Sequence, residues 1–127
     1  GGSVRIPASL CGIVGLKPTY GRVSRFGVYP LSSSCDHVGP MVRTVTDAAV
    51  LLQAIAGSDP KDPTASHVKV PDYTSALKED VRELRLGVPQ EYFFEGVEPA
   101  VRDAVEAALQ HLRFSRSQNL RPMCLMY

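Results

Sequence analysis

The sequence predicts an α/β domain on three observations. Two segments, 44–57 and 98–112, carry apolar residues at the spacing of an amphipathic helix. Between them, residues 84–88 predict a short strand. Of the 127 residues, 44% are hydrophobic and 21% charged, as in a folded globular protein. This length suits one small domain or a piece of a larger one, and the order helix, strand, helix favours helices layered on a sheet.

In the first half of the chain, we expect a short buried strand over 11–18, ended by Pro18, and then an ordered loop over 19–34. Residues 37–43 predict a second short strand or extended turn. The clearest helix follows, because Thr44 is a good N-cap, Asp47 suits the first turn and Gly57 suits the end. Its apolar stripe is predicted to be Val45, Ala48, Ala49, Leu52, Ile55 and Ala56.

In the second half, two prolines and alternating charges predict a surface loop over 59–64. A short helix is expected within 73–79, and a strand over 84–88, stopped by Pro89. Glu98 and Pro99 open the next helix, since proline is tolerated at the first helical position. Its buried face is predicted to be Val101, Val105, Ala108, Leu109 and Leu112.

Residues 113–127 follow neither a helical nor a strand period. They contain three arginines and no acidic residue. A helix that returns to a sheet should be followed by a glycine-containing turn and an apolar strand, and this segment shows the pattern of neither. The predicted division is therefore a domain over 1–112 and an off-pattern basic tail over 113–127. A solvated or artefactual tail, a frameshifted end, and a segment that binds an acidic partner are the open interpretations.

Charge and cysteine usage exclude several classes of protein. The net charge of +1 gives no electrostatic case for nucleic acid or an anionic membrane, and no apolar run is long enough to span a membrane. The three cysteines are widely spaced, with no Cys-x-x-Cys pair and no zinc spacing. We therefore expect small buried thiols in a reducing, cytoplasmic compartment, no metal and no cofactor.

Gly1-Gly2-Ser3 is the first candidate for chemistry. Two glycines allow a tight turn that brings backbone N–H groups close to a ligand, and the serine places a hydroxyl beside those donors. That is how a nucleophile lies beside an oxyanion hole. Taken alone, the tripeptide favours an ordinary linker.

The longer pattern reverses that preference. The chain closely resembles the amidase signature family over roughly residues 1–112. The segments that carry the resemblance are Gly1-Gly2-Ser3-Val4-Arg5-Ile6-Pro7-Ala8, Cys11-Gly12-Ile13-Val14-Gly15-Leu16-Lys17-Pro18-Thr19, Tyr20-Gly21-Arg22-Val23-Ser24, Asp36-His37-Val38-Gly39-Pro40-Met41 and the 44–57 helix. The resemblance implies a fragment of a mixed β-sheet sandwiched by helices.

The resemblance also implies a mechanism. The family cleaves amide C–N bonds with a Ser–Ser–Lys arrangement, in which the nucleophile maps onto Ser3 and the oxyanion donors onto the backbone N–H groups of Gly1, Gly2 and Ser3. The second serine and the lysine would both precede Gly1, and the chain lacks an initiator methionine. We therefore expect a fragment that is inactive alone, whereas its full-length parent hydrolyses amides.

Three further residues have competing interpretations. Arg5 could bind a substrate carboxylate, but a supporting role for the active-site turn, through pairing with a buried acid, is favoured. His37 lies where related amidotransferase A subunits usually have Gln and many free-standing amidases have His. For His37, packing or hydrogen bonding is favoured over catalysis. For Asp36, the favoured role is to cap or tie the loop formed by residues 32–34.

Three functions stay open at this point. The leading one is a stand-alone hydrolase that acts on a small-molecule amide through an acyl-enzyme on Ser3. The rival within the family is the A subunit of a tRNA-dependent amidotransferase, which releases ammonia from glutamine and passes it to partner subunits. The third is a truncated, non-catalytic remnant.

Overall fold

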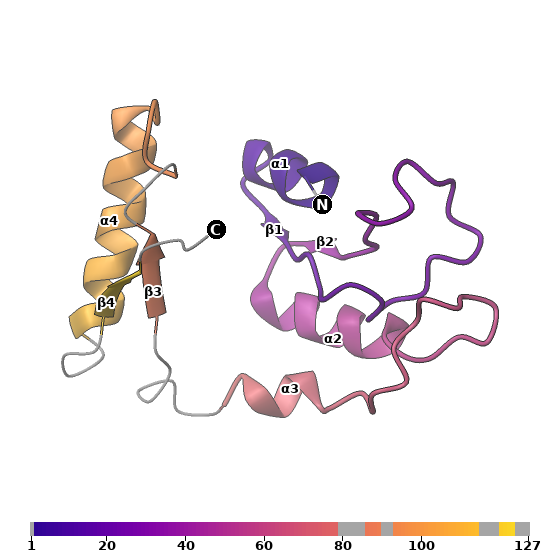
Figure 1. The fold of residues 1–127 in the computed structure, drawn as a ribbon. Coiled ribbons are helices and arrows are strands. Elements are labelled where there is room, and N and C mark those ends of the chain that lie inside the picture. Colours follow the sequence, from indigo (N-terminus) through magenta and orange to yellow (C-terminus); the bar gives the residue numbers. More distant parts are fainter. Residues whose placement is uncertain (1, 79–85, 90–92, 115–119, 124–127) are drawn as a thin grey trace. The chain divides into compact units, whose positions relative to one another are not determined.

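The structure, a computed structural model, describes residues 2–78, 86–89, 93–114 and 120–123. The chain divides into two compact units, Gly1–Glu79 and Asp80–Tyr127, and each is described by itself (Figure 1). The first unit contains α1 (Gly2–Leu10), β1 (Val14–Gly15), β2 (Met41–Val42), α2 (Val45–Ile55) and α3 (Tyr73–Ala76). The second contains β3 (Leu86–Pro89), α4 (Pro99–Phe114) and β4 (Leu120–Met123). The α/β class expected from the sequence is confirmed.

Helix α1 corrects the expectation for the start of the chain. The sequence predicted a tight turn at the opening glycines and a strand over 11–18, but Gly2–Leu10 is helical and only Val14–Gly15 pairs as a strand. Pro7 lies inside α1 and has no N–H to give to the carbonyl of Ser3, four residues earlier. Burial of Val4 and Ala8 on one helical face accounts for a helix that local propensity disfavours.

A Schellman motif ends α1 and turns the chain into β1. Gly12 has a φ of +63°, a left-handed conformation that glycine adopts without strain. Its N–H donates to the carbonyl of Ser9 at 3.2 Å, and the N–H of Ile13 donates to the carbonyl of Ala8 at 2.9 Å. These bonds satisfy carbonyls that the helix end leaves open, and they fix the angle between α1 and the strand.

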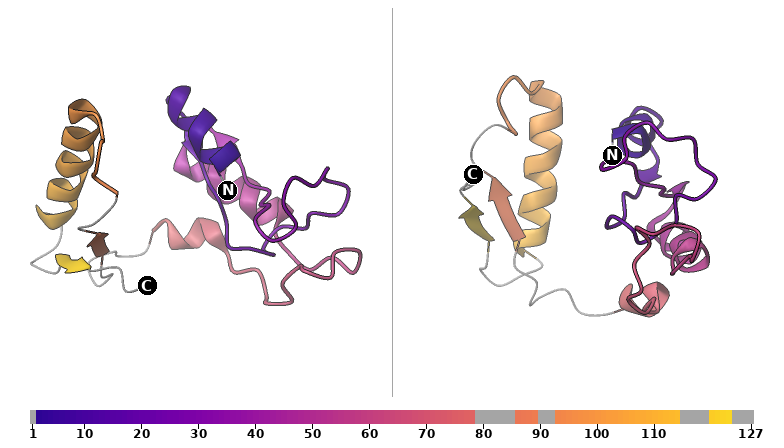
Figure 2. Two further views of the ribbon diagram at one scale, coloured as in Figure 1. Left: turned by 45° about the horizontal axis from the view of Figure 1, so that its top comes forward. Right: turned by 45° about the vertical axis from the view of Figure 1, so that its right-hand side comes forward.

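The β1–β2 pair lies between α1 and α2 (Figures 1 and 2). The two strands are antiparallel, with Val14 opposite Val42 and Gly15 opposite Met41. The ladder continues past β1, since the N–H of Leu16 donates to the carbonyl of Pro40 at 3.0 Å. The predicted strand over 37–43 is therefore confirmed in its last part only.

Helix α2 confirms the clearest sequence prediction. Thr44 is its N-cap, and the Thr44 hydroxyl accepts a hydrogen bond from the N–H of Asp47 at 3.0 Å. Ala48, Ala49 and Leu52 are buried as predicted, whereas Val45 and Ile55 are 59% and 37% exposed. The C-cap is Ala56, one residue before the expected Gly57.

The loops of the first unit are held together by Gly21 and Arg22. Gly21 has a φ of +74°, and a Cβ there would lie 2.3 Å from the carbonyl oxygen of Thr64. Arg22 donates to the hydroxyl of Tyr73 at 2.6 Å and to the carbonyls of Val68 and Lys69. These bonds bring segments far apart in sequence onto one scaffold. The helix expected within 73–79 is confirmed over Tyr73–Ala76; Glu79 lies outside the described residues.

The second unit pairs β3 with β4 in parallel, from Leu86 opposite Leu120 to Pro89 opposite Met123. The predicted helix is confirmed as α4, but Val101 and Val105 are 52% and 41% exposed rather than buried. Residues 84 and 85 of the predicted strand lie outside the described residues. Strand β4 falls where the sequence predicted no strand, and the boundary between 1–112 and 113–127 stays a prediction. No helix in the described segments is long and apolar enough to span a membrane.

Candidate active site

Ser3 lies in the first turn of α1 and is exposed. The first N–H groups of a helix have no acceptor within it, and the helix dipole makes this end positive. The N–H groups of Gly2 and Ser3 therefore suit the stabilisation of negative charge beside the Ser3 hydroxyl. Gly1, the third expected oxyanion donor, lies outside the described residues.

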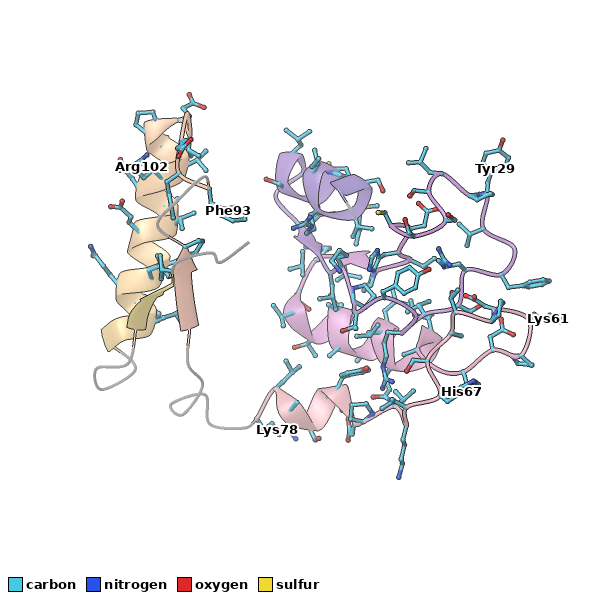
Figure 3. The ribbon with its side chains drawn as sticks, viewed as in Figure 1. Tyr29, Lys61, His67, Lys78, Phe93 and Arg102 are labelled. Carbon is cyan, nitrogen blue, oxygen red and sulfur yellow. The ribbon has the colours of Figure 1, made fainter. Side chains whose placement is uncertain are left out.

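Ser3 borders a cavity of about 410 Å³ within the first unit. The remaining wall comes from two segments, within residues 25–38 and 61–63. The lining residues are Ser3, Arg25, Phe26, Val28, Tyr29, Pro30, Leu31, Ser33, Asp36, His37, Val38, Lys61, Asp62 and Pro63. Figure 3 shows Tyr29 and Lys61 on two of these loops, and Tyr29 is 94% exposed.

Arg25 joins the loops that form the cavity wall. Its Nη1 donates to the carbonyl of Ser33 at 2.7 Å, and its Nη2 donates to the hydroxyl of Thr64 at 2.9 Å. The guanidinium also stacks over the ring of Tyr20, with 4.7 Å between Cζ and the ring centroid. Because its planar group meets three segments at once, Arg25 fixes the shape of the cavity.

Asp62 is the buried acid of the site, at 7% exposure. Its carboxylate accepts hydrogen bonds from the hydroxyl and N–H of Thr64 and from the backbone N–H of Arg25. These donors, with the Thr64 hydroxyl foremost, hold the pKa of Asp62 below its usual value. The negative charge of Asp62 is therefore stabilised by hydrogen bonds within the cavity wall.

Asp36 ties the loop beside it, as the sequence predicted. Its Oδ2 accepts from the backbone N–H groups of Ser32 and Leu31, both at 2.9 Å, and these bonds lower the pKa of Asp36. The next residue, His37, is half-buried: its Nδ1 lies 2.8 Å from the carbonyl oxygen of Cys35, and its ring meets the Tyr20 ring edge-on at 5.5 Å.

Other expected residues lie apart from this cavity. Arg5 is exposed on α1 and does not line it, so its supporting role stays a prediction. Lys17 donates to the carbonyl of Pro18 and does not line the cavity either.

Cys11 and Cys35 are exposed, which corrects the expectation of buried thiols, and Cys124 lies outside the described residues. Among the residues that the structure describes, no cluster of His, Cys, Asp and Glu could hold a metal ion.

Sequence reasoning missed Arg25, Lys61 and Asp62 as parts of the site. Arg25 and Asp62 are 37 positions apart, and no local periodicity links them. One feature of the sequence could have pointed to them: the Asp62-Pro63-Thr64 turn that follows Lys61.

Comparison with known proteins shows the family of the chain. The family model described as Amidase matches residues 1–125. The chain belongs to the Amidase family. The match extends through β4, beyond the resemblance read from residues 1–112.

Its relatives in the Amidase family include curated amidotransferase subunits. The chain is 58% identical over 113 residues to the A subunit of glutamyl-tRNA(Gln) amidotransferase from Chloroflexus aurantiacus, covering 89% of this chain and 23% of that protein. It is 59% identical over 112 residues to the A subunit of the same name from Thermosynechococcus vestitus, covering 88% and 23%. The chain thus spans about a quarter of the length of these curated relatives.

Solved Amidase structures share its fold. The structure of the glutamyl-tRNA(Gln) amidotransferase A subunit from Thermotoga maritima superposes with a TM-score of 0.89 at 42% identity, over 97% of this chain and 27% of that one. A protein from a vestigial complex related to an s-triazine catabolic enzyme gives a TM-score of 0.82 at 40% identity, over 94% and 26%. Similarity of this degree shows that the chain has the amidase fold. The matched part of the chain includes the first unit, which contains Ser3 and the cavity.

Proposed function

We propose that this chain is the nucleophile-bearing segment of an amidotransferase A subunit that releases ammonia from glutamine. The observation that carries the proposal is an exposed serine at the N-terminus of α1, on the rim of a cavity, in a chain 58% identical to the C. aurantiacus A subunit. The preference over a stand-alone hydrolase comes from these relatives. The enzyme acts in the cytoplasm with partner subunits and needs no metal or cofactor.

The chemistry follows from the position of Ser3. Its Oγ attacks the carbonyl carbon of the substrate amide, and the negative charge that forms on the carbonyl oxygen is stabilised by N–H groups of Gly1, Gly2 and Ser3. The C–N bond then breaks, the nitrogen leaves as ammonia after gaining a proton, and water hydrolyses the resulting ester on Ser3. The family resemblance assigns the proton transfers to a lysine and a second serine that are outside this chain.

A second candidate is a stand-alone amide hydrolase, and one residue favours it. His37 lies where the resemblance associates Gln with amidotransferase subunits and His with many free-standing amidases. The two candidates share the Ser3 mechanism. They differ in the amide that is cleaved, glutamine or another small-molecule amide, and in whether the ammonia passes to partner subunits.

The test uses the full-length protein, purified with and without amidotransferase partner subunits. We expect glutamine hydrolysis that rises when the partners and charged tRNA are present, and a loss of about 10⁴-fold or more in kcat for Ser3→Ala. Hydrolysis of simple amides at a rate that ignores the partners would favour the stand-alone hydrolase. Activity that survives Ser3→Ala would overturn both candidates.

A further inference from the structure

The tautomer of His37 is fixed by its surroundings. Nδ1 lies 2.8 Å from the carbonyl oxygen of Cys35, and a carbonyl oxygen can only accept a hydrogen bond. Nδ1 of the neutral ring therefore carries the proton, which leaves the lone pair of Nε2 as an acceptor. Nε2 has no hydrogen-bond partner among the described residues. It is also not buried, because the only buried side-chain nitrogen or oxygen without a partner in those residues is Nε of Arg25. Nε2 is thus open to a ligand.

The position of the ring is also fixed. One edge of the ring packs against Tyr20, with an interplanar angle of 77°. Before it in sequence, Asp36 is bound to its own loop. Two residues after it, Gly39 passes so close to the segment that follows β1 that a Cβ there would lie 2.1 Å from the carbonyl oxygen of Leu16. An acceptor held this firmly loses little entropy when it binds a donor.

The other charged groups that line the cavity mostly bond within its wall, and Nε of Arg25 is the exception. Asp62 accepts from Thr64 and Arg25, and both Nη atoms of Arg25 donate within the wall. Lys61 lies with Nζ 5.1 Å from the centroid of the Phe26 ring. His37 therefore differs from these groups, because its Nε2 makes no hydrogen bond within the wall and can bind a ligand in the cavity.

We propose that Nε2 of His37 accepts a hydrogen bond from an N–H group of the amide substrate in the Ser3 cavity. This inference rests on the proposed function and makes His37 a substrate-binding residue that contributes to specificity. The donor is either the carboxamide nitrogen of glutamine or its α-ammonium group. Both offer N–H bonds to the same acceptor, and substrate analogues can separate them.

The experiment measures KM and kcat of the full-length protein with its partners. His37→Phe keeps a ring against Tyr20 and removes the acceptor, whereas His37→Gln retains an acceptor oxygen. We expect KM for glutamine to rise about tenfold in His37→Phe and less in His37→Gln, with kcat changed less than KM. The matched control is His67→Phe, because His67 bonds Ser58 outside the cavity (Figure 3).

Two analogues identify the donor. The γ-methyl ester of glutamate keeps the ammonium but has no N–H at the scissile bond, and glutaramate keeps the carboxamide but has no ammonium. The effect of His37→Phe should disappear for the analogue that lacks the donor. An equal effect on all three substrates would indicate a purely structural role and overturn the inference, as would no effect at all.

A binding measurement keeps this test independent of turnover. In the Ser3→Ala background, His37→Phe should weaken glutamine binding about tenfold by calorimetry. Unchanged affinity would overturn the role of His37 even if Ser3-dependent glutaminase activity confirmed the proposed function. Conversely, weakened binding together with activity that survives Ser3→Ala would reject the proposed mechanism alone.

Discussion

Gly15 of β1 lies directly against Ala8 of α1, so closely that a Cβ on Gly15 would come within 2.6 Å of the Cβ of Ala8. The same Cβ would lie 2.7 Å from the carbonyl oxygen of Val4, which is backbone and cannot rotate away. Because Val4 follows Ser3 directly in the chain, this contact holds the first turn of α1, and with it Ser3, close to β1.

Gly15→Ala should therefore displace α1. We expect the full-length protein to lose about 1–3 kcal/mol of stability, as in other overpacked sites, and to lose kcat with it. Denaturant unfolding and glutamine hydrolysis measure the two effects. Gly12→Ala is the control, because a Cβ there meets nothing within 4 Å and costs only about 1 kcal/mol for its φ of +63°. Equal losses in both variants would contradict the packing argument.

The helices that the sequence predicted are those whose signals are local. A capping hydroxyl on Thr44 and a stripe around Leu52 are read within one segment, and the same holds for the proline that opens α4. Helix α1 was missed because its glycines and Pro7 disfavour a helix locally, and its stability comes from packing of Val4 and Ala8 in the fold.

The site was predictable only in part, for a similar reason. Ser3 was found because a family pattern surrounds it in sequence. The cavity wall depends on Arg25, Asp62 and Thr64, which meet through loop closure and have no periodicity to reveal them. Strand β4 was missed because the arginine and proline within Leu120–Met123 break the apolar run expected of a paired strand.

Arg25→Ala should open the cavity wall. The change removes the bonds to Ser33 and Thr64 and the stacking on Tyr20, and it leaves the carbonyl of Ser33 with one donor fewer. We expect a loss of about 1–3 kcal/mol and a higher KM for glutamine. Limited proteolysis should cut the full-length variant faster within residues 26–36. Arg43→Ala is the matched control at an exposed arginine, and equally fast cleavage there would count against the role of Arg25.

Asp62 should make the protein sensitive to acid. Its pKa in the folded state is held below the value of about 3.9 expected when unfolded, so the stability it contributes is present above that pH. That stability is lost as the pH falls through the folded-state pKa. We expect the difference in unfolding midpoint between the native protein and Asp62→Asn to shrink steadily below about pH 4. Parallel midpoints from about pH 7 to about pH 3 would show that Asp62 is not responsible.

The 127-residue chain by itself should be inactive and loosely packed. It presents many large apolar side chains to solvent, among them Leu10 at 83%, Tyr29 at 94% and Leu31 at 90% exposure, and in larger proteins such faces are covered by further structure. By family resemblance, the groups that would take the proton from Ser3 lie outside this chain. We therefore expect no amide hydrolysis, strong binding of a hydrophobic dye and a broad thermal transition. A sharp, cooperative transition would show that this segment folds without the rest of the amidase sheet, and turnover lost in Ser3→Ala would show that it finds its base within itself.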